Sequence, residues 1–571
     1  MVDFNEIPSN IRIPGVYAEL DKSNASNTLP QELQSMLVIA QRLKSMICPA
    51  IFQGGTLNNM TSGGAYTGAA VKNFRVKVST AAATDKFKWS TDGGNTWSAE
   101  ISVTGAAQAL SDGVTVTFAA ITGHAVNDEW RFSAYPEPSI AQKIATKVYS
   151  DAEAAKYAGY GSKIHLMIRA AIKAYEYLDL TIVSLDDAAA SVAATGMITF
   201  TGNAASSGVL SLYIASKQVK ILISKDDTPS EMATLLCNEI SMMPDLPVVA
   251  SNLAGVVTLK AKNKGIVGNS IGLGYDIAGA AGVAVAIVEM ANGLGSPDIQ
   301  DALTIVAGKR YHIYVSQFND ADSRTKLRDH LTFVSNAVEQ RPGVGVFGLN
   351  GSLAEATTLA AGETNEIRLQ CAWLRYTSET KRKYMPCEIA AAKAAITAFA
   401  HSVKVGNSET DLEVRGVPLP AIADRLTTTE KQTCLYNGVS YLYVGKGERL
   451  LVGRSITTYV SDANGALDPA FLDVGVMVTT DYCRAAWVDD VKRKFQRQKK
   501  SARTKTRLRS AIIAKAYQLQ EYELIQDVDK HKNGIIVSDN LTDATRLDVE
   551  IPTAIIPGLE IIGMKIKILV Y

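Results

Sequence analysis

Apolar and polar residues alternate along the last stretch of the chain, residues 559–571. One face of this stretch carries Met564, Ile566, Ile568 and Val570, and the other carries two lysines and Leu569. A period of two is typical of a half-buried β-strand. Since no turn or further strand follows it, we expect the strand to pair either with a sheet of its own chain or with a neighbouring copy.

A second extended segment is predicted near the other end, at residues 7–17. Pro8 and Pro14 disfavour a helix there, and each restricts the preceding residue to extended backbone. Chain termini are usually polar and frayed unless something binds them. Strand-like ends on both sides therefore favour a polymer whose ends bind neighbouring copies. The expected contact residues of this segment are Ile11, Ile13, Val16 and Tyr17.

Residues 63–138 differ in composition from their surroundings and are rich in Thr, Ser, Gly and Ala. Short alternating strands are predicted at residues 74–78, 87–90, 114–118 and 130–133. The turn Asp92-Gly93-Gly94-Asn95 is a strong hairpin signal. We interpret this stretch as a small all-β module inserted into a host domain.

A second insertion is predicted at residues 187–295 and mixes strands with one helix. The helix opens after Thr228, where Pro229 takes the first helical position and Glu231 completes a capping box. This pattern predicts an α+β module. Its strands are expected at residues 197–200, 209–214, 219–223, 256–259 and 283–288.

The host domain shows strands that alternate with helices, which is typical of an open α/β sheet. Strands are predicted at residues 36–40, 180–183, 311–315, 344–347 and 367–371. Helices are predicted at residues 142–157, 163–177, 320–339, 352–361 and 386–399. The C-terminal region adds strands at residues 439–444 and 450–456 and helices at residues 483–495 and 509–522.

These patterns predict a multidomain α/β and α+β protein, in which an α/β core sheet carries inserted all-β and α+β modules and extended N- and C-terminal strand arms. The expected boundaries are an N-terminal arm at 1–22, the first part of the core at 23–62 and 139–186, the all-β insert at 63–138, the α+β insert at 187–295, the α/β core at 296–420, a C-terminal domain at 421–557 and a C-terminal arm at 558–571.

Composition agrees with a globular chain of several domains. The 571 residues are 47% hydrophobic and 20% charged, which provides ample core. No window approaches the ~18 uninterrupted apolar residues of a membrane span, and residues 1–6 lack the apolar run of a signal peptide, so we expect neither membrane insertion nor secretion. The six cysteines are scattered without C-x-x-C spacing and are expected to be reduced core residues.

The basic residues are unevenly distributed. Residues 491–520 contain eleven Lys or Arg and no acid, and without them 47 basic residues of the 58 remain against 57 acidic ones. A helix is expected here after Asp489 and Asp490, whose carboxylates suit a helix N-terminus. The members that we expect to face a partner are Lys492, Arg493, Lys494, Arg497, Lys499 and Lys500.

Three interpretations of this basic run are open: a solvated helix face, a nucleic-acid surface and a surface for an acidic protein. Like charges on one helix face repel each other unless they are neutralised, which disfavours the first. Phe495 is the only aromatic residue among the clustered basic ones, so base stacking is poorly served, although phosphate contacts are feasible. All three interpretations stay open on the residues alone, and an acidic protein partner is favoured only by the family resemblance described below.

Motifs for catalysis are missing from the sequence. The six histidines lie far apart, and neither H-E-x-x-H nor G-x-S-x-G occurs. Gly159-Tyr160-Gly161-Ser162 lacks the lysine of a phosphate loop, and Asp186-Asp187 is followed by a stretch typical of a linker. We therefore expect no enzyme, no catalytic residue, no metal site and no cofactor.

Several short segments carry weight through their order along the chain. They are residues 13–17 with 21–23, then 158–162, 264–269, 386–390, 416–420, 491–500 and the closing strand. Taken in this order, they resemble contractile tail sheath proteins of Mu-like, myovirus-type bacteriophages. The resemblance covers nearly the whole chain except residues 63–138, and Ala158 stands where the family usually has Phe.

This resemblance implies a structural subunit that stacks as hexameric rings around an inner tail tube and contracts to drive the tube through the host envelope. It implies that both arms add strands to the C-terminal-domain sheets of neighbours, and that the C-terminal domain with its basic residues faces the tube. The implied partners are other copies of the chain, the tail tube protein, and baseplate and neck or terminator proteins. The implied location is the virion, after assembly in the host cytoplasm, with no nucleic acid bound.

Two alternatives remain at this point. The first is the sheath of a phage-derived contractile injection particle, of the tailocin or secretion type, which sequence separates poorly from a phage tail. The second is a nucleic-acid-binding structural protein that uses the basic run, which would show steep, salt-dependent retention on DNA.

Overall fold

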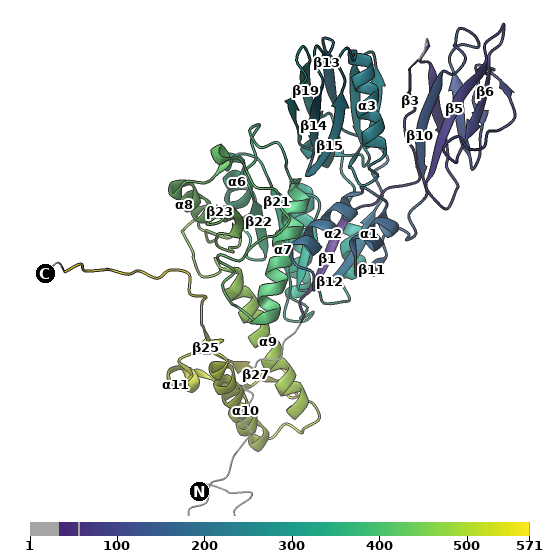
Figure 1. Cartoon of the computed structure of the whole chain (residues 1–571). Helices are drawn as coiled ribbons and strands as arrows, with labels where there is room; N and C mark the ends of the chain where they lie inside the picture. Colours follow the sequence, from purple (N-terminus) through teal and green to yellow (C-terminus); the bar gives the residue numbers. More distant parts are fainter. Residues whose placement is uncertain (1–32, 55–56, 570–571) are drawn as a thin grey trace, which may run out of the picture. The chain divides into compact units, whose positions relative to one another are not determined.

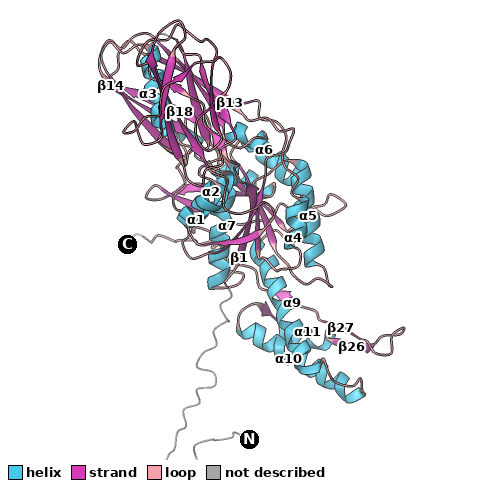
Figure 2. Ribbon diagram, turned by 90° about the vertical axis from the view of Figure 1, so that its right-hand side faces the viewer, coloured by secondary structure: helices cyan, strands magenta, loops and turns pink. Residues whose placement is uncertain are grey.

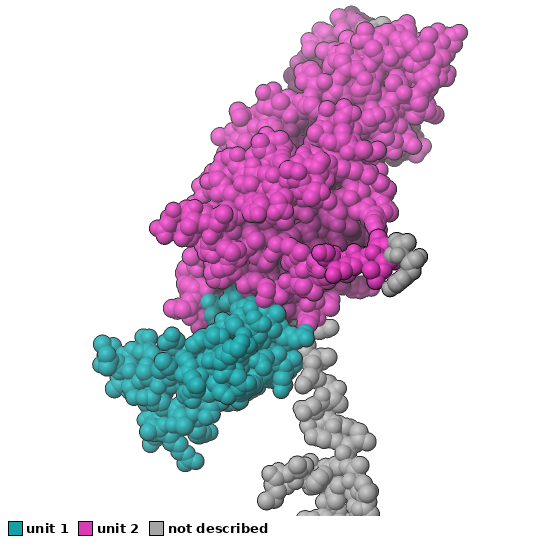
Figure 3. Space-filling view, turned by 90° about the vertical axis from the view of Figure 1, so that its left-hand side faces the viewer, with its two compact units in different colours: residues 1–32, 479–556 teal, residues 33–478, 557–571 magenta. Residues whose placement is uncertain are grey.

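The computed structural model describes residues 33–54 and 57–569. These residues belong to two compact units, one of residues 479–556 and one of residues 33–478 with the C-terminal segment that starts at Pro557 (Figure 3). The expected contact residues Ile11, Ile13, Val16, Tyr17 and Val570 lie outside the described residues.

The larger unit is built around an eight-stranded sheet whose strands come from distant parts of the sequence (Figure 1). In spatial order they are β11 (Ala145–Val148), β12 (Asp179–Leu185), β1 (Ser35–Gln41), β20 (Ile313–Ser316), β21 (Val344–Leu349), β22 (Leu369–Trp373), β23 (Val439–Gly445) and β24 (Arg449–Val452). Neighbours from β12 to β23 are parallel, and the outer strands β11 and β24 are antiparallel. Because β22 pairs with β23, strands on both sides of the boundary expected at residue 420 share this sheet.

Helices cover both faces of this sheet, as the buried apolar runs of its parallel strands require. Figure 2 shows α1 (Asp151–Ala158), α2 (Lys163–Ala174) and α7 (Pro386–Val403) on one face, with α4 (Gln300–Val306) and α5 (Ala321–Ser335) on the other. Two shorter helical segments, α6 (Leu353–Thr357) and η2 (Thr358–Gly362), precede β22, and η3 (Ile422–Asp424) and α8 (Thr428–Tyr436) precede β23.

Helix α7 is buried on nearly every side because it packs against α2 and against β1, β20, β21 and β22. A helix that is apolar all round is expected in such an interior position. Alanines at 390–392, 394, 395, 398 and 400 let it approach its neighbours closely. At its N-terminus the approach requires a glycine in β21, because a Cβ atom on Gly348 would lie 1.8 Å from the carbonyl oxygen of Pro386.

The all-β module consists of two sheets with a core of their own. Phe74 and Phe132 stack with ring centroids 5.2 Å apart, and the ring of Trp130 stands edge-on to Phe118. One sheet contains β2 (Met46–Ile47), β10 (Glu129–Tyr135), β5 (Lys72–Thr80), β6 (Lys86–Ser90), β7 (Ile101–Ser102) and β3 (Ile51–Phe52). The other contains β4 (Met60–Gly64), β9 (Val114–Phe118) and β8 (Gln108–Ala109). The module therefore starts near Met46, earlier than the expected residue 63.

The α+β insertion also has two sheets, with one helix packed on them. The helix α3 (Pro229–Ser241) begins at the predicted capping box, in which the Thr228 Oγ1 accepts from the Glu231 amide and Glu231 accepts from the Thr228 amide. One sheet contains β16 (Val248–Leu253), β17 (Val256–Ala261), β13 (Thr195–Thr201) and β19 (Ala284–Ala291). The other contains β15 (Lys217–Ile223), β14 (Gly208–Ile214) and β18 (Leu273–Ala278). A short 3-10 helix, η1 (Ile266–Ser270), lies between β17 and β18 in the sequence.

The smaller unit is mainly helical. A small core forms around Leu508, Ile512, Ile535 and Val537. Its elements are the C-terminal part of α9 (Val474–Phe495), α10 (Ala502–Glu521), β25 (Ile525–Gln526), α11 (Val528–His531), η4 (Lys532–Gly534), β26 (Ile536–Asp539), β27 (Leu547–Glu550) and β28 (Ala554–Ile555). β25 pairs with β28, and β26 pairs with β27.

Two helices predicted from the sequence differ from those in the structure. The helix expected at residues 142–157 is wrong in its first half, where β11 forms the edge of the sheet. The helix starts only at Asp151, because the Ser150 Oγ caps it by accepting from the Glu153 amide at 3.1 Å. The helix expected at residues 509–522 begins earlier, at Ala502, with Ser501 as its cap.

We expect the all-β module to be removable without unfolding the rest of the larger unit. Met46 and Tyr135 are register partners on β2 and β10, so the chain enters and leaves the module at neighbouring points. Replacing residues 46–135 by a short Gly-Ser bridge should lower the Tm by only a few degrees, since about 1 kcal/mol corresponds to ~2–4 °C. Circular dichroism with thermal melting checks this, and loss of the cooperative transition would contradict it.

Candidate functional site

The C-terminal segment, residues 557–569, lies outside every strand pairing of the described chain. Seven large apolar side chains of this segment are 70% to 84% exposed in the isolated chain. Each would gain about 1.5–3 kcal/mol if fully buried. A continuous apolar exposure of this kind indicates a binding segment. The seven are Leu559, Ile561, Ile562, Met564, Ile566, Ile568 and Leu569.

The first residues of this segment are held against the loop that follows α7. The Thr410 Oγ1 donates to the Glu560 Oε2 at 2.6 Å. Gly558 lies beside Ser408, since a Cβ atom on Gly558 would be 3.5 Å from the Ser408 Cβ. The pKa of Arg454 is raised, mainly by its hydrogen bond to Asp473, and Glu560 adds a smaller electrostatic contribution. We call residues 558–560 the root of the C-terminal segment.

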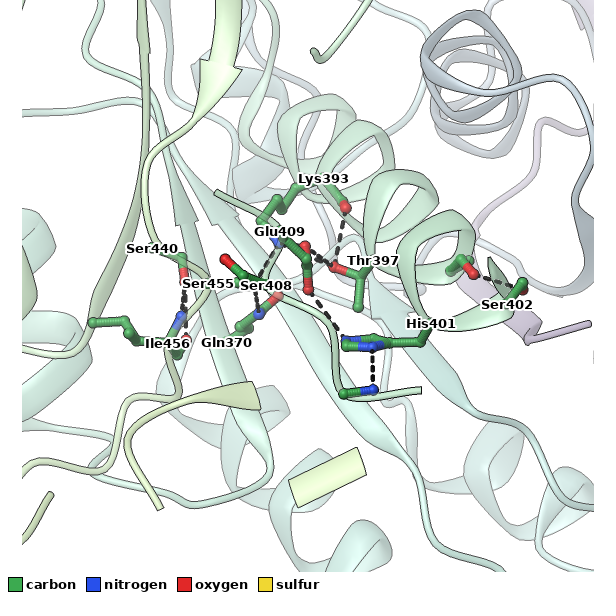
Figure 4. A network of polar contacts seen from close by, with 12 residues as sticks. Gln370, Lys393, Thr397, His401, Ser402, Ser408, Glu409, Ser440, Ser455 and Ile456 are labelled. Carbon is green, nitrogen blue, oxygen red and sulfur yellow. Dashed lines mark hydrogen bonds and ion pairs between the residues drawn. The ribbon is translucent and has the colours of Figure 1, made fainter. Parts of the chain in front are cut away.

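A buried polar network lies directly behind this loop (Figure 4). Lys393 is fully buried within α7, and its Nζ donates to three oxygens: the Glu409 Oε2 at 2.6 Å, the Ser455 Oγ at 2.8 Å and the Thr397 Oγ1 at 2.9 Å. The Thr397 Oγ1 lies 3.0 Å from the Glu409 Oε2, and the Gln370 Nε2 donates to the Ser455 Oγ at 2.7 Å.

The carboxylate of Glu409 is stabilised as an anion despite its burial. Burial alone would raise its pKa, but the charge of Lys393 and the hydrogen bonds from His401 and Lys393 outweigh it and hold the pKa well below its ordinary range. His401 places its Nε2 3.4 Å from the Glu409 Oε1, while its Nδ1 accepts from the Gly406 amide at 3.3 Å. The network thus fixes the loop of residues 406–410 to α7.

The basic residues are not on one helix. Lys492, Arg493 and Lys494 lie in the last turn of α9, which ends at Phe495. Arg497, Lys499 and Lys500 follow in the connection before α10. The expected role of Asp489 and Asp490 at a helix N-terminus is wrong, because α9 begins sixteen residues earlier than Asp490, at Val474.

Acids from elsewhere neutralise part of this basic run. Asp490 accepts from Arg493 and Lys494, both at 2.7 Å. Asp539, on β26, is 3.2 Å from Lys500 and 3.0 Å from Lys505. Three of the six basic residues expected to face a partner, Arg493, Lys494 and Lys500, therefore have a counter-charge within the protein. Within the described residues, five exposed members have no carboxylate within 4 Å: Lys492, Arg497, Lys499, Arg503 and Arg507.

The hairpin of β26 and β27 offers unpaired strand edges. It is a two-stranded sheet, so among the described residues neither outer edge is paired. Val537 packs into the core of the smaller unit, whereas Ile536 and Val549 are exposed. Edges of this kind are ready to accept a further strand.

The residues singled out for chemistry have structural partners. Asp186 pairs with Arg42 and Lys44, and Asp187 accepts from Gln41, Asn263 and the Lys264 amide. Ser162 caps α2, and the Gly161 amide donates to His165. In the described part of the chain no group of three or more His, Cys, Asp or Glu residues could hold a metal ion, and the six cysteines are free. None of the described helices is long and apolar enough to cross a membrane.

Sequence reasoning missed the network around Lys393, although one signal was present. The helix at Pro386–Val403 is rich in Ala and Ile, and Lys393 stands in its middle. A lysine within an apolar helix is almost always paired if it is buried. Its partners Glu409 and Ser455 come from later segments, so the sequence alone gave no means to identify them.

Two family profiles and a known relative match this chain. The family profile of the phage tail sheath protein central domain matches residues 292–458, and that of the phage tail sheath C-terminal domain matches residues 467–568. A Mu-like prophage FluMu tail sheath protein from Haemophilus influenzae is 28% identical over 421 residues, which cover 71% of this chain and 85% of the relative.

Two solved sheath tail proteins are similar at lower identity. The protein from Desulfitobacterium hafniense has a TM-score of 0.40 and 14% identity, over 73% of this chain and 94% of that chain. The protein from Listeria innocua has a TM-score of 0.41 and 13% identity, over 73% of this chain and 89% of that chain. The two family profiles that match residues 292–458 and 467–568 describe domains of a structural tail subunit. The chain therefore carries the central and C-terminal domains of phage tail sheath proteins, which confirms the resemblance found in its sequence.

We expect Glu409→Gln to destabilise the protein in a pH-dependent way. Because the folded pKa of Glu409 is depressed, its contribution is present above the ordinary carboxyl pKa and is lost as the pH falls toward the folded value. The variant should lose about 3–5 kcal/mol at pH 7, since it leaves the Lys393 charge unpaired. The difference from wild type should shrink below about pH 4.5.

Denaturant unfolding at pH 7 and at pH 4 measures this difference. The exposed Glu176→Gln is the control, and it should stay within about 0.5 kcal/mol of wild type at both pH values. A loss in Glu409→Gln that is equal at both pH values would show that the carboxylate charge does not carry the effect.

Proposed function

We propose that this chain is the repeating subunit of a contractile phage tail sheath, which polymerises with copies of itself around an inner tail tube and contracts to drive the tube through the host envelope. The two matched tail sheath domains and the similarity to a Mu-like tail sheath protein support the class of structure. The observation that carries the mode of assembly is the exposed apolar C-terminal segment, which has no strand partner among the described residues.

The C-terminal segment acts as an arm that adds a strand to a neighbouring subunit. Strand addition supplies main-chain hydrogen bonds of about 0.5–1.5 kcal/mol net each, and they repeat along the strand. Met564, Ile566 and Ile568 share one face of an extended chain, so they can be buried together on the acceptor. Such links survive rotation of the bodies that they join, which a contracting assembly requires.

The acceptor that fits best is the hairpin of β26 and β27 in a neighbouring copy. Its edges are unpaired in the described chain, and the exposed Ile536 and Val549 offer apolar contacts next to them. The segment before residue 33 contains the predicted second arm, with Ile11, Ile13, Val16 and Tyr17 as its contacts.

The inner tube is proposed to contact the basic residues that lack an internal carboxylate, chiefly Lys492, Arg497 and Lys499. Lys500, Arg493 and Lys494 are already paired within the unit, so they contribute less to an external contact. A tube surface with acidic residues would supply the missing counter-charges along its length.

The assembly is proposed to consist of hexameric rings in a helical stack, with baseplate and neck or terminator proteins at its two ends, in the virion. The subunit has a structural role and needs no hydrolysis, because contraction can release an extended state that lies above a more compact one. A sheath of a phage-derived injection particle would use the same contacts, and electron microscopy of the whole particle separates the two.

Removing the arm should abolish polymerisation but leave the subunit folded. A chain that ends at Pro557 loses the seven exposed apolar side chains and no residue of either core cluster. We expect a soluble protein with the wild-type Tm that forms no cylinders by negative-stain microscopy. Sheaths of normal length from this truncation would refute the arm.

Charge reversal at the tube-facing residues should block assembly around tubes only. Lys492→Glu, Arg497→Glu and Lys499→Glu change exposed side chains, so the free energy of unfolding should stay within about 0.5 kcal/mol per site. Sedimentation with purified tubes should show at least about a tenfold loss of tube-bound sheath, while tube-free polymers persist.

The matched control reverses Lys220, Lys225 and Lys260 of the α+β insertion, which are exposed and change the net charge equally. This control should assemble normally. Normal tube binding by the first triple variant would mean that these charges face solvent, and retention of the wild-type protein on DNA with a steep salt dependence would favour the nucleic-acid alternative.

A further inference from the structure

The buried ammonium of Lys393 connects two chain segments that are far apart in sequence. Each of its three hydrogens has an acceptor, namely Thr397 on its own helix, Glu409 on the loop after α7, and Ser455 after β24. The helix itself is fixed by its burial between α2 and the sheet. Lys393 therefore locates both segments relative to a rigid element.

Those two segments are the ones that hold the root of the C-terminal arm. Glu409 stands between Ser408, which lies against Gly558, and Thr410, whose hydroxyl donates to Glu560. Ser455 follows Arg454, whose charge interacts with Glu560. The network and the arm thus meet through adjacent residues on two separate segments of the chain. Figure 4 shows Ser408, Glu409 and Ser455 of these segments near Lys393.

An apolar residue in place of Lys393 would fill the same space but would not hold the neighbouring segments in defined positions. Three hydrogen bonds from one ammonium define the positions of three oxygens, whereas dispersion contacts tolerate sliding. Buried ion pairs contribute little net stability compared with apolar residues of similar volume. Positioning therefore explains this buried charge better than stability does.

We propose that Lys393, through Glu409 and Ser455, is the positioning residue that sets where the C-terminal arm leaves the subunit. This inference rests on the proposed role of the residues after 557 as the exchanged arm. A fixed root limits the volume that the free arm samples, which raises its effective concentration at the acceptor on a neighbour. His401 supports the same loop through Glu409 and the Gly406 amide.

The test uses the full-length chain and separates positioning from stability. The double variant Lys393→Met with Glu409→Leu replaces the ion pair by apolar residues of similar size, so the Tm should stay near that of wild type. Hydrogen exchange followed by mass spectrometry should show about tenfold faster exchange in peptides covering residues 406–412 and 556–562, with peptides of β21 and α2 unchanged. The rate of sheath formation should fall several-fold. A folded double variant with wild-type exchange and wild-type assembly would overturn the proposal.

Two milder variants decide the matter if the double variant does not fold. Ser455→Ala removes one acceptor of Lys393, and Thr410→Val removes the direct bond to Glu560 while preserving shape. Both should speed exchange at residues 556–562, and Lys220→Ala, on the surface of the α+β insertion, should not. Unchanged exchange in Ser455→Ala would overturn the role of Lys393. If the chain ending at Pro557 still polymerises, the arm proposal fails, whereas the exchange of the root in the full-length chain still tests the positioning role.

Discussion

The close packing of α7 against the central sheet is the constraint on which the larger unit depends. Small side chains on α7 and the glycine at position 348 permit a distance that no larger residue would allow. The same closeness excludes water, so the lysine inside this helix must find its counter-charge within the protein. The counter-charge comes from the loop after the helix, which makes the position of that loop a consequence of core packing.

Local patterns predicted the parts of the fold that depend on local chemistry. The capping box at Thr228 identified the start of α3, and alternation located strands such as β9 and β14. The error at residues 142–157 arose because β11 is an edge strand without strong alternation, so its strand state depends on pairing with β12. The mixed α/β character was predictable, but the joining of eight strands into one sheet depends on contacts between distant segments.

The candidate surfaces were predictable to different extents. The apolar alternation of the C-terminal segment was visible in the sequence, but its exposure was not, because pairing with a sheet of its own chain was equally open. The neutralisation of the basic run was not predictable either, because Asp539 lies 34 residues from Lys505 and reaches it only through the folding of the hairpin beside α10. Asp490 was visible in the sequence, but its spacing of three and four to Arg493 and Lys494 indicates pairing along a helix, not a helix start.

The entry and exit of the all-β module at neighbouring points have a consequence for how such chains diversify. Met46 and Tyr135 are register partners, so the chain leaves and re-enters the host at neighbouring points. The module therefore acts in the host fold as a short connection, whatever its size. Lengthening, shortening or exchanging the module leaves the order of the eight strands untouched. A chain of this design can therefore change its appended module while the packing of α7 and the polar network around Lys393 stay the same.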